Sequence, residues 1–357
     1  MVENDASPRM RSAIAYPFTA IVGQAVLKRA LILNVVNPTI GGVLIRGEKG
    51  TGKSLAVRGL LDILPEILIS KGCKFNCHPE DPPDRLCTAC RVRKEDEGKL
   101  EPVTVRMKMV DLPLNITEDR LVGSIDIERV LSEGVKAFEP GILAEAHRGI
   151  LYVDEINLLE DSIVDVLLDA AAMGMVTVER EGISLNYSSQ FIIIGSMNPE
   201  EGELRPQLLD RLALQAEVRG IEDIESRVEI IKRAREFQED PLFFREKWEA
   251  QQAEMKRRIT GAISRLPSVA TPTRIVEIIS RLGIDFNIDG HRGDIIIERT
   301  ARTNAAFEGR KETTVEDVVL AAELALPHRM RKQPFEEEEF SVEMLRKLAR
   351  KYEAEGM

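Results

Sequence analysis

The spacing of apolar residues through the first 200 positions predicts helices that alternate with buried strands. Apolar residues at helical spacing predict helices over 21–36, 54–64, 127–137, 141–147 and 157–172. Short apolar or alternating runs predict strands over 42–46, 100–109, 149–153 and 191–195. Two further runs flank Arg180-Glu181-Gly182 and predict a β-hairpin over 175–187. Buried strands that alternate with helices are typical of a parallel α/β sheet.

Beyond about Gly220 the pattern is helical. Helices are predicted over 221–237, 242–266, 273–282, 292–307, 314–325 and 341–354. Thr314 and Asp317 have the spacing of a capping box at one helix start. We therefore predict a lead-in over 1–18, an α/β domain over 19–240 and a helical domain over 241–357. Residues 72–98 interrupt the α/β pattern and are interpreted as an insertion.

Composition and charge narrow the class of protein. The chain has 357 residues, of which 43% are hydrophobic and 31% charged, as in a globular protein of about two domains. Its net charge of −11 disfavours sequence-independent binding to nucleic acid. No apolar run approaches the ~18 residues of a membrane span, and the first 12 residues lack the apolar stretch of a secretory signal. We expect a cytosolic type of protein without a nucleic-acid partner.

A glycine-rich segment supplies the strongest chemical motif. The eight residues Gly47, Glu48, Lys49, Gly50, Thr51, Gly52, Lys53 and Ser54 fit the phosphate-loop pattern between a predicted strand and helix. Glycines let backbone N–H groups turn toward phosphate oxygens. Lys53 is expected to reach the β- and γ-phosphates of ATP, and the Ser54 hydroxyl to bind Mg²⁺. A chance glycine turn is the alternative, and the strand and helix on either side argue against it.

Polar residues follow two further predicted strands. Asp154 and Glu155 end the strand over 149–153, and we expect Asp154 to hold the Mg²⁺ of Mg-ATP and Glu155 to activate water. Asn198 follows the strand over 191–195 and suits a water-positioning amide. A turn residue before Pro199 is an equally good interpretation of Asn198 from spacing alone.

These motifs, with the string over 208–211, resemble those of AAA+ ATPases. The strings over 18–24, 138–149, 154–159 and 204–211 resemble the I-subunit family of magnesium chelatase, over nearly the whole chain. The resemblance implies an AAA+ phosphate-loop domain with a parallel sheet flanked by helices and a hairpin insertion. It also implies an all-α C-terminal lid.

The resemblance further implies partners and site residues. Members form hexameric rings that bind ATP and Mg²⁺ between subunits. They work with a D subunit and a porphyrin-binding H subunit to insert Mg²⁺ into protoporphyrin IX for chlorophyll synthesis. In the family pattern Asn198 is a sensor, Arg211 an arginine finger and Arg292 the lid sensor. A cation at a helix start opposes the helix dipole, which supports a role for Arg292 independently, and the similarly placed Arg274 is the reserve candidate. The alternatives are an exposed arginine for Arg292 and a surface salt bridge with Asp210 for Arg211. The expected compartment is cyanobacterial cytoplasm, or plastid stroma for a mature plant-type chain.

Three alternative functions differ in class. A MoxR-like remodelling chaperone would share the loop, hairpin and finger. A DNA-acting motor is disfavoured by the acidic charge and by the absence of a helix-turn-helix signature. A degenerate structural ring member is disfavoured because Lys53, Asp154 and Glu155 are all present.

The four cysteines leave the chemistry of the insertion open. Cys73 and Cys77 are separated by three residues, and Cys87 and Cys90 by two. A Cys-x-x-Cys pair suits zinc, and His78 can replace one thiol. A zinc knuckle and a thiol switch are comparably supported, with plain loop cysteines close behind.

Overall fold

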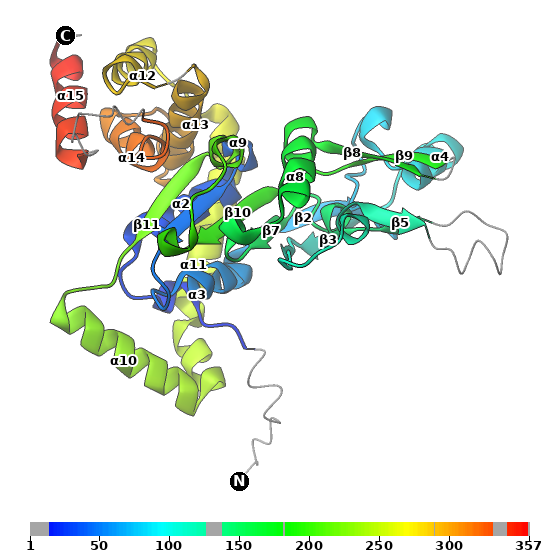
Figure 1. The fold of residues 1–357 in the computed structure, drawn as a ribbon, viewed down its shortest axis with the longest axis horizontal. Coiled ribbons are helices and arrows are strands. Elements are labelled where there is room, and N and C mark those ends of the chain that lie inside the picture. The colour runs from blue at the N-terminus through cyan, green and yellow to red at the C-terminus, as the bar shows by residue number, and fades with distance from the viewer. Residues whose placement is uncertain (1–13, 126–137, 181–182, 289, 331–340, 356–357) are drawn as a thin grey trace. The chain divides into compact units, whose positions relative to one another are not determined.

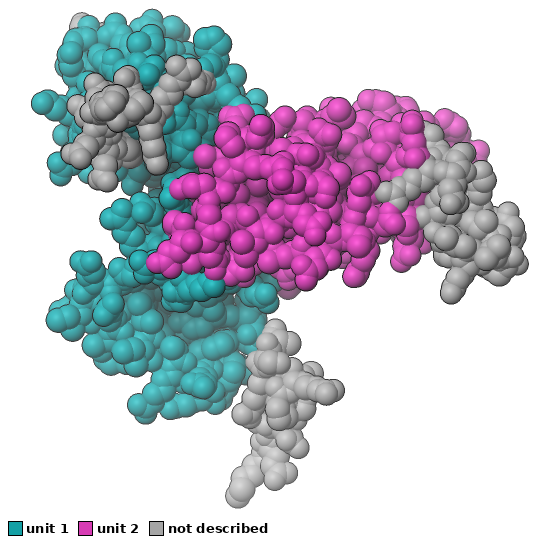
Figure 2. Space-filling model, viewed as in Figure 1, with its two compact units in different colours: residues 1–40, 45–64, 215–357 teal, residues 41–44, 65–214 magenta. Residues whose placement is uncertain are grey.

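The computed structural model describes residues 14–125, 138–180, 183–288, 290–330 and 341–355. The helix predicted over 127–137 lies outside these residues, as does most of the predicted lead-in. The described chain clusters into two compact units, coloured separately in Figure 2. The first unit comprises residues 1–40, 45–64 and 215–357, and the second comprises 41–44 and 65–214.

The largest sheet of the described residues has five strands (Figure 1), and the phosphate-loop segment, Asp154 and Asn198 each follow one of them. Its strands are β1 (Val43–Gly47), β4 (Met109–Asp111), β7 (Ile150–Val153), β10 (Ile192–Met197) and β11 (Leu214–Val218). The strand order is β11-β1-β10-β7-β4. Strand β7 runs parallel to both β10 and β4, and Val153 lies opposite Gly195 in the register. All residues of β7 and β10 are buried, which explains their continuous apolar character.

Helices make up most of the first unit. Its α-helices are α2 (Ala25–Val36), α3 (Lys53–Gly59), α10 (Ile224–Glu239), α11 (Pro241–Arg265), α12 (Thr273–Asp285), α13 (Arg292–Phe307), α14 (Val315–Ala325) and α15 (Val342–Glu355). Short 3₁₀ helices are η1 (Phe18–Ala20), η2 (Pro38–Ile40), η3 (Leu60–Ile63) and η7 (Leu266–Ser268). The elements that follow β11 in the described ranges are all helical, as predicted.

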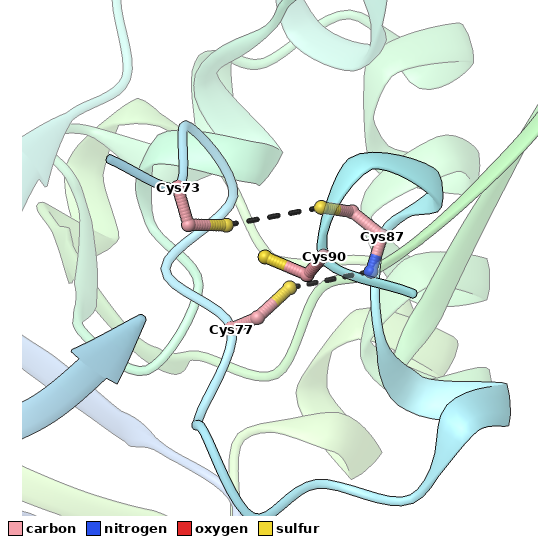
Figure 3. Close-up of side chains that lie close together, drawn as sticks. All are labelled: Cys73, Cys77, Cys87 and Cys90. Atoms are coloured by element: carbon pink, nitrogen blue, oxygen red, sulfur yellow. Dashed lines mark hydrogen bonds between the residues drawn. The ribbon is translucent and has the colours of Figure 1, made fainter. Parts of the chain in front are cut away.

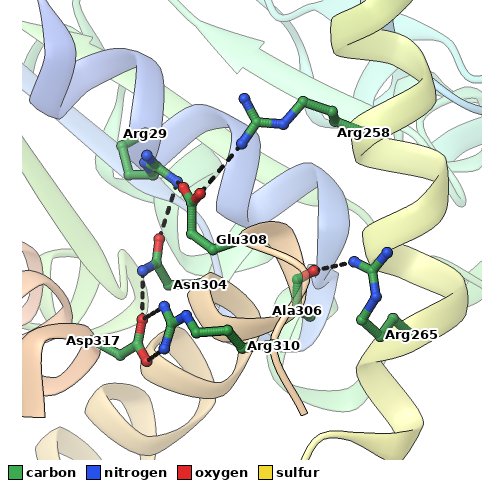
Figure 4. A network of polar contacts seen from close by, with 8 residues as sticks. All are labelled: Arg29, Arg258, Arg265, Asn304, Ala306, Glu308, Arg310 and Asp317. Atoms are coloured by element: carbon green, nitrogen blue, oxygen red, sulfur yellow. Dashed lines mark hydrogen bonds and ion pairs between the residues drawn. The ribbon is translucent and has the colours of Figure 1, made fainter. Parts of the chain in front are cut away.

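A polar network centred on the buried Asp317 and Asn304 joins α14 and α13 to α2 and α11 within this unit (Figure 4). The Asp317 side chain is fully buried, and its carboxylate accepts hydrogen bonds from both Nη atoms of Arg310 and from Asn304 Nδ2. The Asn304 Oδ1 atom accepts in turn from Arg29, which also pairs with Glu308 at 2.5 Å. The capping box predicted from Thr314 and Asp317 is confirmed.

The second unit carries the remaining strands and several short helices. Its strands outside the central sheet are β2 (Glu66–Ser70), β3 (Pro102–Arg106), β5 (Gly123–Ile125), β6 (Phe138–Pro140), β8 (Met175–Arg180) and β9 (Ile183–Ser188). Its helices are α4 (Thr88–Glu97), α5 (Glu118–Val122), α7 (Ile142–Glu145), α8 (Asp161–Met173) and α9 (Pro206–Arg211), with η4 (Pro83–Arg85), η5 (Ile156–Leu158) and η6 (Pro199–Glu201). Strands β8 and β9 pair antiparallel, so the predicted hairpin is confirmed.

Two predictions of elements differ from the structure. The single strand predicted over 100–109 is wrong, because β3 pairs with β2 whereas β4 pairs with β7. Met107 N–H still bonds to Pro65 O, next to the Glu66–Arg106 pair of β2 and β3. Lys108 O already accepts from Ile150 N of β7, so the chain changes its partner strand between Met107 and Lys108. The helix predicted over 157–172 begins later, at Asp161, after η5. Strands β2 and β11 and helix α4 were not predicted. Strand β11 has the alternation of a half-buried strand, but over only five residues, whereas α4 has few apolar residues and buries only Cys90.

Candidate functional site

The phosphate-loop segment lies at the turn from β1 to α3. Gly47 ends the strand, and a Cβ atom there would lie 2.2 Å from Val218 O, so a side chain cannot be accommodated. Gly50 and Gly52 have φ angles of 79° and 83°, which residues with a Cβ rarely adopt. The predicted strand–loop–helix context of the motif is therefore confirmed.

The side chains of the loop contact its own backbone. Lys53 Nζ donates hydrogen bonds to Gly47 O and, at 3.0 Å, to Glu48 O. Thr51 Oγ1 donates to the same Glu48 O at 2.8 Å. The first turn of α3 contains no acidic residue, so no carboxylate there opposes an anion.

Asp154 and Glu155 follow β7 and differ in environment. The Asp154 side chain accepts hydrogen bonds from Tyr152 OH, at 2.9 Å, and from Ser196 Oγ. Glu155 has a φ of 54°, and its backbone N–H donates to the same Ser196 Oγ at 3.2 Å. Ser196 thus links the acidic pair on β7 to strand β10.

Asn198 lies just beyond β10, at the same sheet edge as Asp154. This follows from the parallel register, in which Gly195 lies opposite Val153. The Asn198 side chain is 5% exposed, and its Oδ1 accepts from Glu200 N at 3.3 Å, capping η6. Asn198 therefore has the geometry of a turn residue that caps a helix, as one of its two interpretations predicts. Its role in positioning water remains a prediction.

The three candidate arginines occupy helix termini. Arg211 is the last residue of α9 in the second unit. Arg292 is the first residue of α13, as predicted, and is partly buried. Arg274 is exposed near the start of α12, where it lines a small hollow with Arg281 and Tyr352. Their roles as finger and sensors remain predictions.

Sequence reasoning missed two polar residues of the second unit. Ser196 could have been noticed as a hydroxyl within the apolar run of β10. His147 is 3% exposed, and its Nδ1 accepts from Gln190 N at 2.9 Å. Burial, with a smaller contribution from the nearby Arg148 charge, lowers the pKa of His147 to about 4. The ring is therefore neutral near pH 7.

Among the described residues, no helix combines the length and the apolar character needed to cross a bilayer.

Family models match two parts of the chain. The model described as "Magnesium chelatase, subunit ChlI" matches residues 128–207. The model described as "AAA lid domain" matches residues 276–348, within the helical C-terminal region.

Curated relatives match nearly the whole chain. A magnesium-chelatase subunit ChlI homolog of Methanocaldococcus jannaschii is 52% identical over 96% of this chain and 92% of its own length. The ChlI subunit of Synechocystis sp. is 49% identical over 93% of this chain and 92% of its own length. The chloroplastic ChlI subunit of Oryza sativa subsp. indica is 51% identical over 90% of this chain and 77% of its own length.

Solved structures agree with the predicted fold class. A BchI–BchD complex of magnesium chelatase contains a chain that is 43% identical, with a TM-score of 0.51, covering 93% of this chain and 99% of that one. A putative ATPase from Cytophaga hutchinsonii is 16% identical, with a TM-score of 0.60, over 93% of this chain and 90% of that chain. The second likeness concerns the fold alone.

Proposed function

The chain belongs to the magnesium-chelatase ChlI family, and on that premise we propose that it is the AAA+ ATPase subunit of a magnesium chelatase. The observation that carries this proposal is the intact phosphate loop between β1 and α3, together with the Asp154–Ser196 pair. Hydrolysis of ATP would drive insertion of Mg²⁺, as substrate, into protoporphyrin IX held by a partner subunit. The chaperone and DNA-motor alternatives are not favoured, because the relatives are named as chelatase subunits.

The loop residues fit a nucleotide phosphate. The positions where Cβ atoms of Gly50 and Gly52 would lie have no atom within 4 Å, so the glycines leave open space beside the loop. Lys53 brings a cation to the same loop. We infer that the backbone N–H groups of residues 47–54 and Lys53 Nζ bind the phosphates, and that Ser54 and Asp154 hold Mg²⁺. When bound there, Mg²⁺ would neutralise charge on the phosphates.

The remaining residues are proposed to act on water and on developing charge. The Glu155 carboxylate would accept a proton from the attacking water, and Asn198 would orient that water through its amide. Ser196 Oγ positions Asp154 by donating a hydrogen bond to its carboxylate. Arg211 would stabilise charge on a phosphate bound by a neighbouring subunit, and Arg292, or else Arg274, would contact nucleotide from the lid.

The proposed assembly is a ring that works with two partners. Support for the D partner comes from the BchI–BchD structure, whose chain is 43% identical to this one. We further propose that the ring is a hexamer and that an H subunit holds the porphyrin. We propose cytoplasm or plastid stroma as the compartment, because relatives include a Synechocystis protein and chloroplastic proteins.

A reconstitution assay tests the function. The chain is mixed with purified D and H subunits, Mg-ATP and protoporphyrin IX, and metal insertion is followed by porphyrin fluorescence. We expect insertion only when all three proteins and ATP are present. Insertion that is unchanged when this chain is omitted would contradict the proposal.

Two variants separate binding from hydrolysis. Lys53→Ala should abolish ATPase activity and insertion, because the loop loses the cation that contacts the β- and γ-phosphates. Glu155→Gln should bind ATP normally, measured with a fluorescent nucleotide, but should not hydrolyse it, since an amide cannot accept the proton. Arg58→Ala removes an exposed cation from the same helix as Lys53 and should behave as the parent. Near-parent hydrolysis by Lys53→Ala would refute the assigned site.

A further inference from the structure

The four cysteines converge within the second unit (Figure 3). Cys73 and Cys77 lie on the segment after β2, whereas Cys87 caps α4 and Cys90 lies in its first turn. Their Sγ atoms all lie within 4.8 Å of one another, and Cys73 and Cys87 are 3.8 Å apart. Cys77, Cys87 and Cys90 are buried, and Cys73 is partly buried. Among the described residues, this is the one group of three or more potential ligands found together.

The Sγ atoms lie close enough together to surround a single ion, and the 3.8 Å between Cys73 and Cys87 is the separation that tetrahedral zinc requires. Four zinc–sulfur bonds of about 2.3 Å in a tetrahedron place neighbouring sulfurs about 3.8 Å apart. A disulfide requires about 2.05 Å, and all four thiols are free. A four-iron cluster would place irons and sulfides between the thiolates and would hold them farther apart. Spacings of three and two residues within the pairs both fall in the range of structural zinc sites.

We propose that Cys73, Cys77, Cys87 and Cys90 bind one structural zinc ion. His78 is not needed as a ligand, because four thiolates complete a tetrahedron. Its Nδ1 instead accepts a hydrogen bond from Glu80 N at 3.1 Å. The site is closed, with four protein ligands and no position left for water, so its role is structural.

Neighbouring N–H groups donate hydrogen bonds to three of the four sulfur atoms, which would stabilise them as thiolates. Phe75 N donates to Cys73 Sγ at 3.4 Å, and Cys87 N donates to Cys77 Sγ at 3.3 Å. Arg93 Nη2 donates to Cys90 Sγ at 3.1 Å. A zinc ion with four thiolates carries a net charge of −2, which the Arg93 guanidinium partly balances. Such outer contacts orient ligands and strengthen metal binding.

The insertion has only a small apolar core of its own, which includes the neighbouring Leu100. Its buried cluster consists of Cys77, Leu86, Cys87, Cys90 and Leu100, so three of the five members are thiols. Small folds of this kind usually depend on a metal or a disulfide. A zinc ion would link the segment after β2 to helix α4.

The zinc site would also hold neighbouring elements in place. Between the first two cysteines, Phe75 packs on the ring of Tyr187 in β9 with centroids 5.2 Å apart. Asn76 Nδ2 donates to the backbone oxygens of Glu145 and His147, at 3.2 and 3.4 Å. Ser188 Oγ, at the end of β9, donates to Arg85 O at 2.7 Å. The β8–β9 hairpin and the end of α7 therefore contact the segment over 73–90, whose conformation the zinc ion would fix.

Metal content provides the primary test. Full-length protein purified without chelators should contain one zinc per chain by plasma mass spectrometry. Because the chain has four cysteines in all, a mercurial reagent should titrate four thiols and release one zinc. Stoichiometric iron, or a chain that stays metal-free after refolding with added zinc, would overturn the proposal. Neither measurement depends on ATPase activity.

Variants and cobalt substitution test the ligands. Cys87→Ser and Cys90→Ser should each lower zinc affinity at least tenfold, whereas Ala89→Ser adds a hydroxyl beside Cys90 and should keep the zinc. Protein refolded with Co²⁺ should show the intense visible absorption of tetrahedral cobalt thiolate. Absence of this absorption would overturn the four-thiolate geometry even if the serine variants fail to fold.

Hydrogen exchange tests whether the zinc ion also stabilises the β8–β9 hairpin. Removal of zinc should increase amide exchange in β8 and β9. Unchanged exchange would show that the zinc ion does not stabilise the hairpin.

Discussion

Glu155 and His147 lie on either side of β7, and each has an unusual property that its hydrogen bonds and burial explain. Glu155 has a left-handed backbone conformation, which costs about 1–2 kcal/mol for a residue with a Cβ. Its N–H bonds to Ser196 Oγ and so helps to offset this cost. His147, just before the strand, is buried and neutral, with a hydrogen bond to one ring nitrogen. Its Nε2 has no partner among the described residues, so protonation would bury an unpaired charge.

The titration of His147 predicts a loss of stability in mild acid. Its pKa falls from 6.5 to about 4 on folding, so the unfolded chain binds the proton first. The stabilisation is fully present above pH 6.5 and is lost as pH falls through about 4. The loss amounts to about 3 kcal/mol, from 1.36 kcal/mol for each pKa unit. Unfolding by urea at a series of pH values measures it.

A variant isolates this contribution. His147→Asn keeps an acceptor near the Nδ1 position but cannot titrate in this range. Its difference from the parent in the free energy of unfolding should shrink as pH falls from 6.5 to 4. Measurement at pH 8, where the histidine is neutral in both states, gives the packing cost alone. A difference that stays constant with pH would contradict the assignment.

At the scale of elements, the polar network around Asp317 holds four helices of the first unit together. This carboxylate caps α14 and accepts from Arg310 and from Asn304 in α13. The hydrogen bonds that Arg310 donates to the Asp317 carboxylate raise the pKa of Arg310. The chain of contacts continues through Arg29 in α2 to Glu308, which also pairs with Arg258 in α11 at 3.4 Å (Figure 4).

Removal of the central carboxylate should destabilise the helical region. Asp317→Ala leaves the Asn304 amide buried without its partner and removes a helix cap, at a cost of about 3 kcal/mol. The midpoint of thermal unfolding should fall by several degrees. Glu316→Ala removes an exposed carboxylate from the same turn and serves as the control. Equal midpoints for the two variants would show that the network contributes little.

At the scale of the whole molecule, the proposed ring predicts that active sites are shared between subunits. If Arg211 acts on a phosphate bound by a neighbour, Arg211→Ala should bind ATP normally. It should hydrolyse ATP ~10³–10⁵-fold more slowly, the effect of removing an arginine finger. Nucleotide binding and steady-state hydrolysis measure the two properties separately.

Mixed assemblies test the shared site directly. Arg211→Ala retains its own phosphate loop, and Lys53→Ala retains its own arginine, so a mixed ring contains some complete sites. Partial ATPase activity should therefore return when the two inactive variants are combined. Persistent inactivity at every ratio, despite demonstrated co-assembly, would mean that Arg211 does not act across a subunit boundary.

The contiguous parts of the candidate site were predictable from the sequence. The phosphate loop depends on eight successive residues, of which Gly50 and Gly52 meet backbone requirements that are local to the turn. The hairpin, the capping box of α14 and the helical C-terminal region also follow from short-range patterns. Strand β11 has such a pattern too, with buried Leu214, Ala216 and Val218 alternating with less buried residues, although it was not predicted.

Only the tertiary structure decided which distant residues meet. Ser196 and Asp154 are 42 positions apart, and the parallel register of β10 on β7 brings them together. Likewise, the cysteine spacings left zinc and a thiol switch comparably supported, until packing of α4 against the segment after β2 placed four sulfurs within 4.8 Å. Local periodicity depends on neighbours along the chain. Convergence depends on strand register and packing, which no short segment determines.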